Sequence, residues 1–258
     1  MHSVFCFKRF AVRQESSSMK VNTDAVLLGA WAGIPSGNEP FFFLDIGTGT
    51  GVIALMIAQR LSDLKLNFRA TAIDPDHNSI NESAFNFANS PWASSLSAKE
   101  MTLEEFMLME KGDCFDIIVT NPPFFTNSLK SSSSRKSASR HNEILPFSTI
   151  VKASEYLLKQ DGKLSLILPE EERLHFMSEI NKAAVASGPS LFLTRICQVK
   201  TLPCKEVKRV LMEFTKFPAD KSVMDVGGII REELCIYNSD RTSKSMEYKK
   251  LIRDFYLE

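Results

Sequence analysis

The sequence DIGTGTG (residues 45–51) connects two segments of different periodicity. FFFLDI (41–46) is a short apolar run typical of a buried strand, and in VIALMIAQRL (52–61) the apolar residues recur at helical spacing. Glycines between a strand and a helix allow a tight turn and a close approach of the backbone to a ligand, to which the helix N-terminus presents N–H groups. These residues predict a βα unit with a ligand site at the end of the strand.

The alternation of short apolar runs with helical runs continues along the chain. Further strands are expected at residues 70–74, 96–101, 115–120 and 163–169. Helices are expected at residues 77–89, 103–110, 147–159 and 170–186. This order is typical of an α/β fold, a parallel sheet covered by helices on both faces. The β-type runs 191–199 and 208–217 have no helix between them, so we expect an antiparallel pair at one edge of the sheet.

Composition limits the class of protein. The 258 residues suffice for one large or two modest domains, and 44% hydrophobic with 24% charged residues is ordinary for a globular protein. No apolar run has the ~20 residues of a membrane span, and the first residues do not resemble a signal peptide, so we expect a cytoplasmic protein without membrane contact. Five scattered cysteines favour reduced thiols, and no histidine pairs with them at metal-ligand spacing, so no metal is expected.

The spacing of the glycines indicates which ligand the turn binds. They follow a G-x-G-x-G pattern at Gly47, Gly49 and Gly51, with Thr48 between the first two, whereas a dinucleotide-binding turn has G-x-G-x-x-G. Asp45 suits a ligand that carries an amine. Asp74, at the end of the second strand, suits two ribose hydroxyls, although DPD (74–76) is also good turn chemistry. An amine and a ribose together describe S-adenosylmethionine.

A second motif, NPPF (121–124), follows the strand at 115–120. Proline fixes its own φ and has no N–H, so these residues cannot continue a strand and form a stiff, extended exit from the sheet. Such an exit can aim functional groups. On its own, however, the motif is explained equally well as a connecting loop.

With DIGTGTG, Asp74 and NPPF in this order, the chain resembles the class I S-adenosylmethionine-dependent methyltransferases that act on amine nitrogens. That resemblance implies a Rossmann-like, seven-stranded, mostly parallel sheet in the order 3-2-1-4-5-7-6. Over its whole length the chain is also similar to the bacterial tRNA1(Val) (adenine-37-N6)-methyltransferase family. The segments that carry this similarity are FKRFAVRQESSSMKVNTDAVLLGAWA (7–32), NSPW (89–92), NPPFF with its Ser-rich loop, and EYKKLIRDFYLE (247–258).

The family resemblance implies a single methyltransferase domain over residues 1–258. Its expected parts are an N-terminal lid segment (1–35), a mobile polar loop (126–143) and a C-terminal extension (220–258). The lid places four residues near the methionine end of the cofactor: Lys20, Asn22, Thr23 and Asp24. Methyltransferases of this class often carry an acid after the third strand for the adenine amine, and here Thr102 stands at that position.

NPPF suits an amine nitrogen that is a poor nucleophile. The lone pair of adenine N6 is delocalised into the ring, and two acceptors aimed at its two hydrogens favour the tetrahedral form in which the lone pair is free. The side-chain oxygen of Asn121 and the carbonyl of Pro122 are those acceptors, Pro122 and Pro123 hold them rigid, and Phe124 stacks on the purine. The expected reaction is methylation of N6 of adenine 37 in the anticodon loop of valine tRNA.

Lysine plus arginine equals aspartate plus glutamate, so overall charge argues neither for nor against a nucleic-acid partner. The acid-free stretch LKSSSSRKSASRHN (129–142) offers a local patch for tRNA phosphates, or is only a solvated loop. The four RNA-binding candidates in it are Lys130, Arg135, Lys136 and Arg140.

Other functions remain open from the residues alone. NPPF also suits a methyltransferase that acts on guanine N2 of ribosomal RNA or on a glutamine amide of a protein, since both present a planar nitrogen. From other classes come a nicotinamide-binding oxidoreductase, which the glycine spacing disfavours, and an inactive RNA-binding module. The oligomeric state does not follow from the sequence.

Overall fold

The structure is a computed structural model of the whole chain. It describes residues 3–17, 19–36, 40–123, 145–188, 190–218 and 227–256. Several predictions concern other residues: Phe124, the polar loop at 126–143, and the basic side chains of Lys130, Arg135, Lys136 and Arg140 lie outside the described residues.

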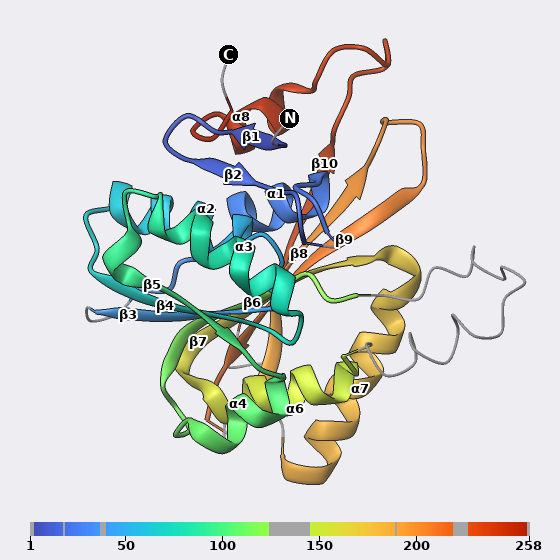
Figure 1. Ribbon diagram of the computed structural model, residues 1–258. Helices are drawn as coiled ribbons and strands as arrows, with labels where there is room; N and C mark the ends of the chain where they lie inside the picture. Colours follow the sequence, from blue (N-terminus) through green and yellow to red (C-terminus); the bar gives the residue numbers. More distant parts are fainter. Residues whose placement is uncertain are drawn as a thin grey trace, which may run out of the picture.

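The centre of the molecule is an eight-stranded sheet in the order β10-β8-β9-β7-β6-β3-β4-β5 (Figure 1). Its strands are β3 (Phe41–Ile46), β4 (Phe68–Asp74), β5 (Leu96–Glu100), β6 (Phe115–Thr120), β7 (Leu158–Pro169), β8 (Leu191–Lys200), β9 (Val207–Lys216) and β10 (Ile230–Cys235). The expected order 3-2-1-4-5-7-6 corresponds to β5-β4-β3-β6-β7-β9-β8 and is confirmed. So is the antiparallel pair of β8 and β9, with β9 also antiparallel to β7.

The expectation of seven strands needs one correction, because β10 adds an eighth beside β8 and runs parallel to it. Its sequence IREELC has four exposed residues in succession, so it lacks both an apolar run and a regular alternation. An edge strand gains its backbone hydrogen bonds from one neighbour and tolerates such a polar sequence. For this reason the sequence does not predict a strand at these residues, which lie within the expected C-terminal extension.

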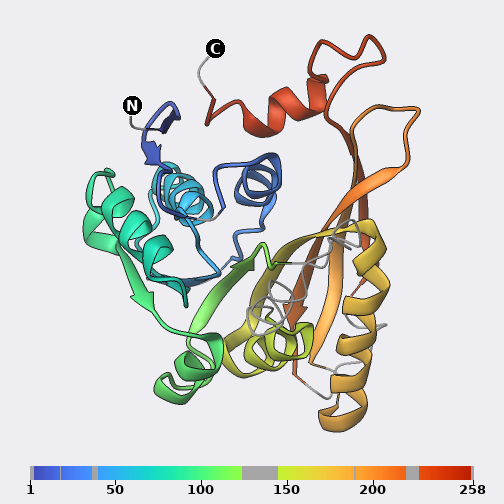
Figure 2. The same ribbon diagram turned by 45° about the vertical axis from the view of Figure 1, so that its right-hand side comes forward.

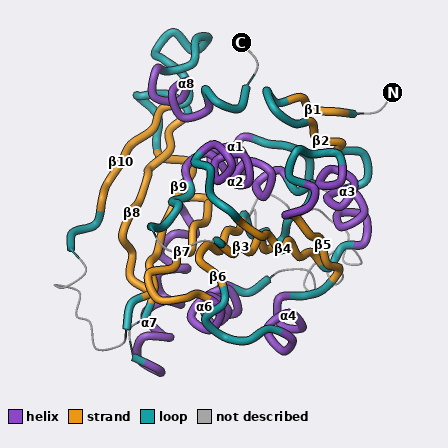
Figure 3. Tube along the Cα trace, turned by 90° about the vertical axis from the view of Figure 1, so that its left-hand side faces the viewer, coloured by secondary structure: helices purple, strands orange, loops and turns teal. Residues whose placement is uncertain are grey.

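Helices cover both faces of the sheet, as expected, and the sheet separates two hydrophobic cores (Figure 3). On one face lie α1 (Thr23–Trp31), α2 (Val52–Asp63), α3 (His77–Ala88) and α8 (Met246–Ile252). On the other lie α4 (Leu103–Met109), α6 (Phe147–Leu157) and α7 (Arg173–Ser187). Two short 3-10 turns, η1 (Ala93–Ser95) and η2 (Glu170–Glu172), precede β5 and α7. Figure 2 shows the second group of helices beneath the sheet.

The alternation along β3 shows how the sheet serves both cores. Phe41 and Phe43 belong to the core under α1 and α2, whereas Leu44 and Ile46 belong to the core under α6. Asp45 follows the parity of Phe41 and Phe43 and therefore faces the α2 side. The only carboxylate of this strand is thus placed at the start of the helix that follows the glycine turn.

The two ends of the chain pack against each other on the α1–α2 face (Figure 1). A hairpin of β1 (Val4–Cys6) and β2 (Ala11–Arg13) lies next to the C-terminal segment that follows α8. The backbone N–H of Lys8 donates to the carbonyl of Phe255 at 2.8 Å, and the rings of Phe5 and Phe7 each lie 5.8 Å from that of Tyr256. The C-terminal residues therefore fix the N-terminal hairpin.

Candidate active site

Three strand ends bring the predicted site residues together. In the register of the sheet, Ile46 of β3 is opposite Ile73 of β4 and Thr120 of β6. The Thr120 hydroxyl donates to the Ile46 carbonyl at 3.0 Å and ties β6 to β3 where both strands end. Asp74 and Asn121 each follow one of these partners, so the acid after β4 and the amide after β6 flank the glycine turn.

The three glycines of the turn have positive φ angles, which residues with side chains rarely adopt. Gly47, Gly49 and Gly51 have φ values of 69°, 53° and 81°. A Cβ at Gly51 would lie 2.5 Å from the ring of Phe87, so this position excludes any side chain on steric grounds as well. A Cβ at Gly47 would meet nothing within 4 Å. The turn therefore packs tightly against α3 on one side and leaves open space at Gly47.

Asp45 is fully buried and only half satisfied. The Thr48 hydroxyl donates to its Oδ2 at 2.7 Å, while Oδ1 has no hydrogen-bond partner among the described residues. Burial raises the pKa of Asp45 to about 7, against the opposing effects of the Thr48 hydroxyl and of the nearby backbone N–H of Ala54, and the charge of Asp74 raises it further. A cationic group of a ligand next to Oδ1 would compensate the cost of this buried charge.

Asp74 connects the glycine turn with the start of α3. Its Oδ2 accepts the N–H of Gly49 at 3.0 Å, and its Oδ1 accepts the N–H of Asp76 at 2.9 Å. Burial raises the pKa of Asp74, although these two hydrogen bonds oppose the effect. The second bond is the turn interaction expected of DPD. Each carboxylate oxygen keeps a lone pair, so the side chain can still accept two hydroxyl groups.

Asn121 is buried at the end of β6, with 7% of its surface exposed. Its Nδ2 lies 3.9 Å from the Sδ atom of Met19, and its Oδ1 has no hydrogen-bond partner among the described residues. Pro122 is buried as well, and Pro123 is exposed. A buried amide oxygen without a donor costs free energy, so within the described part of the chain this Oδ1 is an acceptor that is available to a ligand.

Three of the other predicted cofactor residues form hydrogen bonds within the protein, and two are exposed. Asn22 caps α1 by accepting the N–H of Ala25 at 2.9 Å, and Asp24 accepts from the guanidinium of Arg209 at 2.7 Å. Thr102 caps α4 in a capping box with Glu105. Lys20 and Thr23 are exposed. The cofactor roles of Lys20, Asn22, Thr23, Asp24 and Thr102 therefore stay predictions.

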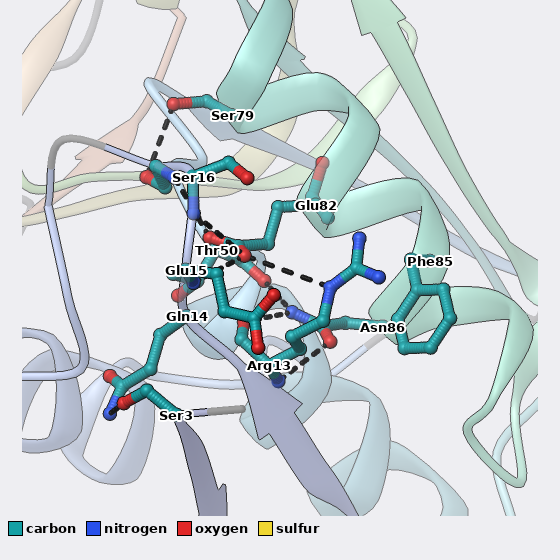
Figure 4. A network of polar contacts seen from close by, with 12 residues as sticks. Ser3, Arg13, Gln14, Glu15, Ser16, Thr50, Ser79, Glu82, Phe85 and Asn86 are labelled. Atoms are coloured by element: carbon teal, nitrogen blue, oxygen red, sulfur yellow. Dashed lines mark hydrogen bonds and ion pairs between the residues drawn. The ribbon is translucent and has the colours of Figure 1, made fainter. Parts of the chain in front are cut away.

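Sequence reasoning did not find the contacts that hold the N-terminal residues above the glycine turn. Glu82 and Asn86 of α3 are both buried and bind the backbone of residues 13–17 (Figure 4). Their spacing of one helical turn is a weak signal, since polar residues at i and i+4 are common on solvated helix faces. Only their burial distinguishes them from such a face.

The described residues lack two other features. They contain no group of three or more His, Cys, Asp or Glu side chains placed to hold a metal ion. Among the helices that the structure describes, none has the length and apolar character needed to cross a membrane.

Comparison with known proteins identifies the family. The model of the methyltransferase small domain matches residues 38–187, which is more than half of the chain. A tRNA1(Val) (adenine(37)-N6)-methyltransferase of Flavobacterium johnsoniae is 37% identical over 99% of this chain and 100% of its own length. The enzyme of the same name from Phocaeicola vulgatus is 38% identical over 98% and 97%. The chain belongs to this family.

Solved structures agree on the fold. A predicted O-methyltransferase from Agrobacterium tumefaciens superposes with a TM-score of 0.64 at 14% identity and covers 90% of this chain and 96% of its own. A Listeria monocytogenes protein assigned to the class I S-adenosylmethionine-dependent methyltransferases has a TM-score of 0.56 at 14% identity, with coverage of 89% and 67%. The expected class I methyltransferase fold is confirmed.

This methyltransferase uses S-adenosylmethionine, as its family does, and the residues at the strand ends fit that cofactor. The Oδ1 of Asp45, which accepts no hydrogen bond from the described residues, suits the cofactor's ammonium group, and the open space at Gly47 leaves room beside the turn. The remaining lone pairs of Asp74 suit ribose hydroxyls. The cofactor supplies an electrophilic methyl group on a sulfonium centre.

Proposed function

We propose that this methyltransferase transfers a methyl group to the exocyclic N6 of adenine 37 in the anticodon loop of valine tRNA. The observation that carries the proposal is the buried Oδ1 of Asn121 at the end of β6, which has no hydrogen-bond partner among the residues that the structure describes. The names of relatives that match over the full length of the chain supply the substrate. With a tRNA as substrate, the enzyme acts in the cytoplasm.

In this proposal Asn121 and Pro122 prepare the amine. The Oδ1 of Asn121 accepts one N6 hydrogen and the carbonyl of Pro122 accepts the other, which favours a tetrahedral nitrogen with a free lone pair. The two prolines fix the direction of both acceptors because their φ angles are locked. Phe124, which lies outside the described residues, is assigned to stacking on the adenine.

Asp45 and Asp74 position the cofactor. The carboxylate of Asp45 becomes fully ionised when an ammonium group binds, since the positive charge offsets its desolvation. Asp74 holds the ribose while its bond to the N–H of Gly49 keeps the glycine turn in place. Once N6 has gained a fourth substituent its proton is strongly acidic and passes to solvent. The site therefore needs no dedicated base.

Substrate exchange tests the proposal. Unmodified valine tRNA is incubated with the enzyme and methyl-labelled cofactor, in parallel with the same tRNA carrying guanosine at position 37 and with ribosomal RNA. The expected result is label in the first substrate alone, recovered as N6-methyladenosine. Methylation of ribosomal RNA at guanine N2, or labelling of the guanosine-37 tRNA at the rate of the natural one, would assign a different substrate.

A further inference from the structure

Glu82 of α3 is a fully buried carboxylate that is bound by backbone groups. Its Oε1 accepts the N–H groups of Glu15 at 2.6 Å and Ser16 at 3.1 Å, and its Oε2 accepts the N–H of Ser17 at 2.9 Å (Figure 4). Three consecutive backbone donors thus converge on one side chain. The guanidinium Nε of Arg13, in β2, lies 3.8 Å from the same Oε1. A buried carboxylate is tolerated only when it is bound in this way, so the burial of Glu82 depends on the position of Arg13 and of residues 15–17.

Asn86, one helical turn further along α3, makes a second set of contacts. Its Oδ1 accepts the N–H of Arg13 at 2.8 Å, and its Nδ2 donates to the carbonyls of Arg13 and Thr50, both at 2.9 Å. Thr50 belongs to the glycine turn. One side chain therefore joins the N-terminal residues to the turn that follows β3.

The contacts continue toward the proposed catalytic amide. The hydroxyl of Ser17 lies 3.2 Å from that of Ser79 and 3.6 Å from the position a Cβ would take at Gly49. The carbonyl of Met19 is 3.9 Å from the Cβ position at Gly49, and the Sδ atom of Met19 contacts the side chain of Asn121. Residues 14–17 and 19–22, called the N-terminal loop below, thus lie over the glycine turn and reach the end of β6.

The N-terminal loop has no helix or strand that would hold it by its own hydrogen bonds. Its ends are joined because the Oε1 of Gln14 accepts the N–H of Val21 at 2.8 Å. The hairpin before it is fixed independently by the C-terminal segment, as the bond from Lys8 to Phe255 shows. Loss of the Glu82 carboxylate should therefore loosen the loop over α3, while Asn86 and the C-terminal segment keep the hairpin in place.

We propose that Glu82, supported by Asn86, is a positioning residue that holds the N-terminal loop over the cofactor and sets the cofactor affinity of the site. The inference rests on the proposed function, because it places S-adenosylmethionine beside the glycine turn that this loop covers. Glu82 contacts neither cofactor nor substrate. It acts through the loop.

The test compares Glu82→Gln with Glu213→Gln. An amide offers one acceptor atom instead of two, so it cannot satisfy both Glu15 and Ser17 as Glu82 does. Glu213 is a matched control because it is also buried, 2% exposed, and accepts a backbone N–H, that of Gly33 at 2.7 Å. Loss of a charge-assisted hydrogen bond predicts that Glu82→Gln weakens cofactor binding by about 10- to 100-fold. Glu213→Gln should leave cofactor affinity within about twofold, because the partners of Glu213 are Gly33, Lys163 and Ser165, which lie outside the cofactor site.

A second readout follows the loop itself. Trypsin should cut after Lys20 faster in Glu82→Gln than in the wild type, and the cofactor should slow this cleavage in the wild type alone. The KM for cofactor should rise while the KM for tRNA stays unchanged. Ser16→Pro removes the N–H that Ser16 donates to Glu82 and leaves the carboxylate intact. This variant should also weaken cofactor binding and speed cleavage after Lys20, and it replaces Glu82→Gln in the test if that variant does not fold.

The outcomes separate this inference from the proposed function. Wild-type protein that binds cofactor and methylates tRNA supports the function whatever the variants do. If Glu82→Gln then loses thermal stability but keeps wild-type cofactor affinity and wild-type cleavage after Lys20, Glu82 is only a structural residue and the inference is wrong.

Discussion

Replacement of Asp45 by asparagine should stabilise the cofactor-free protein and weaken the cofactor at the same time. Burial raises the pKa of Asp45 to about 7 from its ordinary value of 3.8. When the pKa of a carboxyl is higher in the folded than in the unfolded protein, its contribution to the free energy of unfolding is fully present below the unfolded-state pKa. This contribution is lost as the pH rises through the folded-state pKa. Between about pH 4 and pH 7 the wild type therefore becomes less stable, relative to a variant that cannot ionise.

The size of the effect follows from the shift. A difference of about three pKa units corresponds to at most ~4 kcal/mol above pH 7. Asparagine keeps an acceptor for the Thr48 hydroxyl, so the hydrogen bond at Oδ2 is preserved. We expect Asp45→Asn and wild type to have similar free energies of unfolding at pH 4. At pH 8 the variant should be more stable, by an amount that approaches ~4 kcal/mol.

Urea unfolding of the cofactor-free proteins at both pH values measures this difference, because other titrating groups contribute equally to variant and wild type. Calorimetry with S-adenosylmethionine supplies the other half. Affinity of the wild type should fall as pH drops below about 7, where Asp45 is neutral, and affinity of the variant should be low with little dependence on pH. A variant that is less stable than wild type at pH 8, or that binds the cofactor normally, would refute the role given to Asp45.

Two further variants test the cofactor and RNA assignments. Asp74→Ala should weaken cofactor binding, since each charge-assisted hydrogen bond to a ribose hydroxyl contributes roughly 1.5–3 kcal/mol before compensation, while circular dichroism stays that of the wild type; unchanged affinity in calorimetry would remove Asp74 from the site. Alanine at four basic positions should raise the KM for tRNA and flatten its salt dependence without altering cofactor affinity, and an unchanged salt slope would show that they bind no phosphates. These positions are Lys130, Arg135, Lys136 and Arg140.

The order of the central strands could be predicted because it follows from two local signals. Apolar runs of strand length mark strands that are buried on both faces, and glycines and prolines mark their ends. The motifs that contain Asp45, Asp74 and Asn121 each mark the end of a predicted strand. In the structure these strands are parallel neighbours, and their register brings the three ends to one edge of the sheet.

Contacts that depend on tertiary burial could not be predicted in this way. Strand β10 is polar because it lies at the sheet edge, and its pairing with β8 leaves no mark in its own sequence. Glu82 and Asn86 have the spacing of a solvated helix face, and only the fold shows that a distant segment covers them. Thr102 was assigned by its place after the third strand, a rule that does not reveal its role as a helix cap.

The central claim concerns the buried amide oxygen of Asn121, which no group in the described part of the chain satisfies. Single-turnover methylation of valine tRNA by Asn121→Ala tests this claim most directly. The mutation removes an acceptor that matters most when N6 becomes tetrahedral, so the rate of methyl transfer should fall by ~10²–10³. Cofactor affinity measured on the same preparation should hardly change. A near-normal single-turnover rate would contradict the account, because the buried oxygen at the end of β6 would then have no part in the reaction.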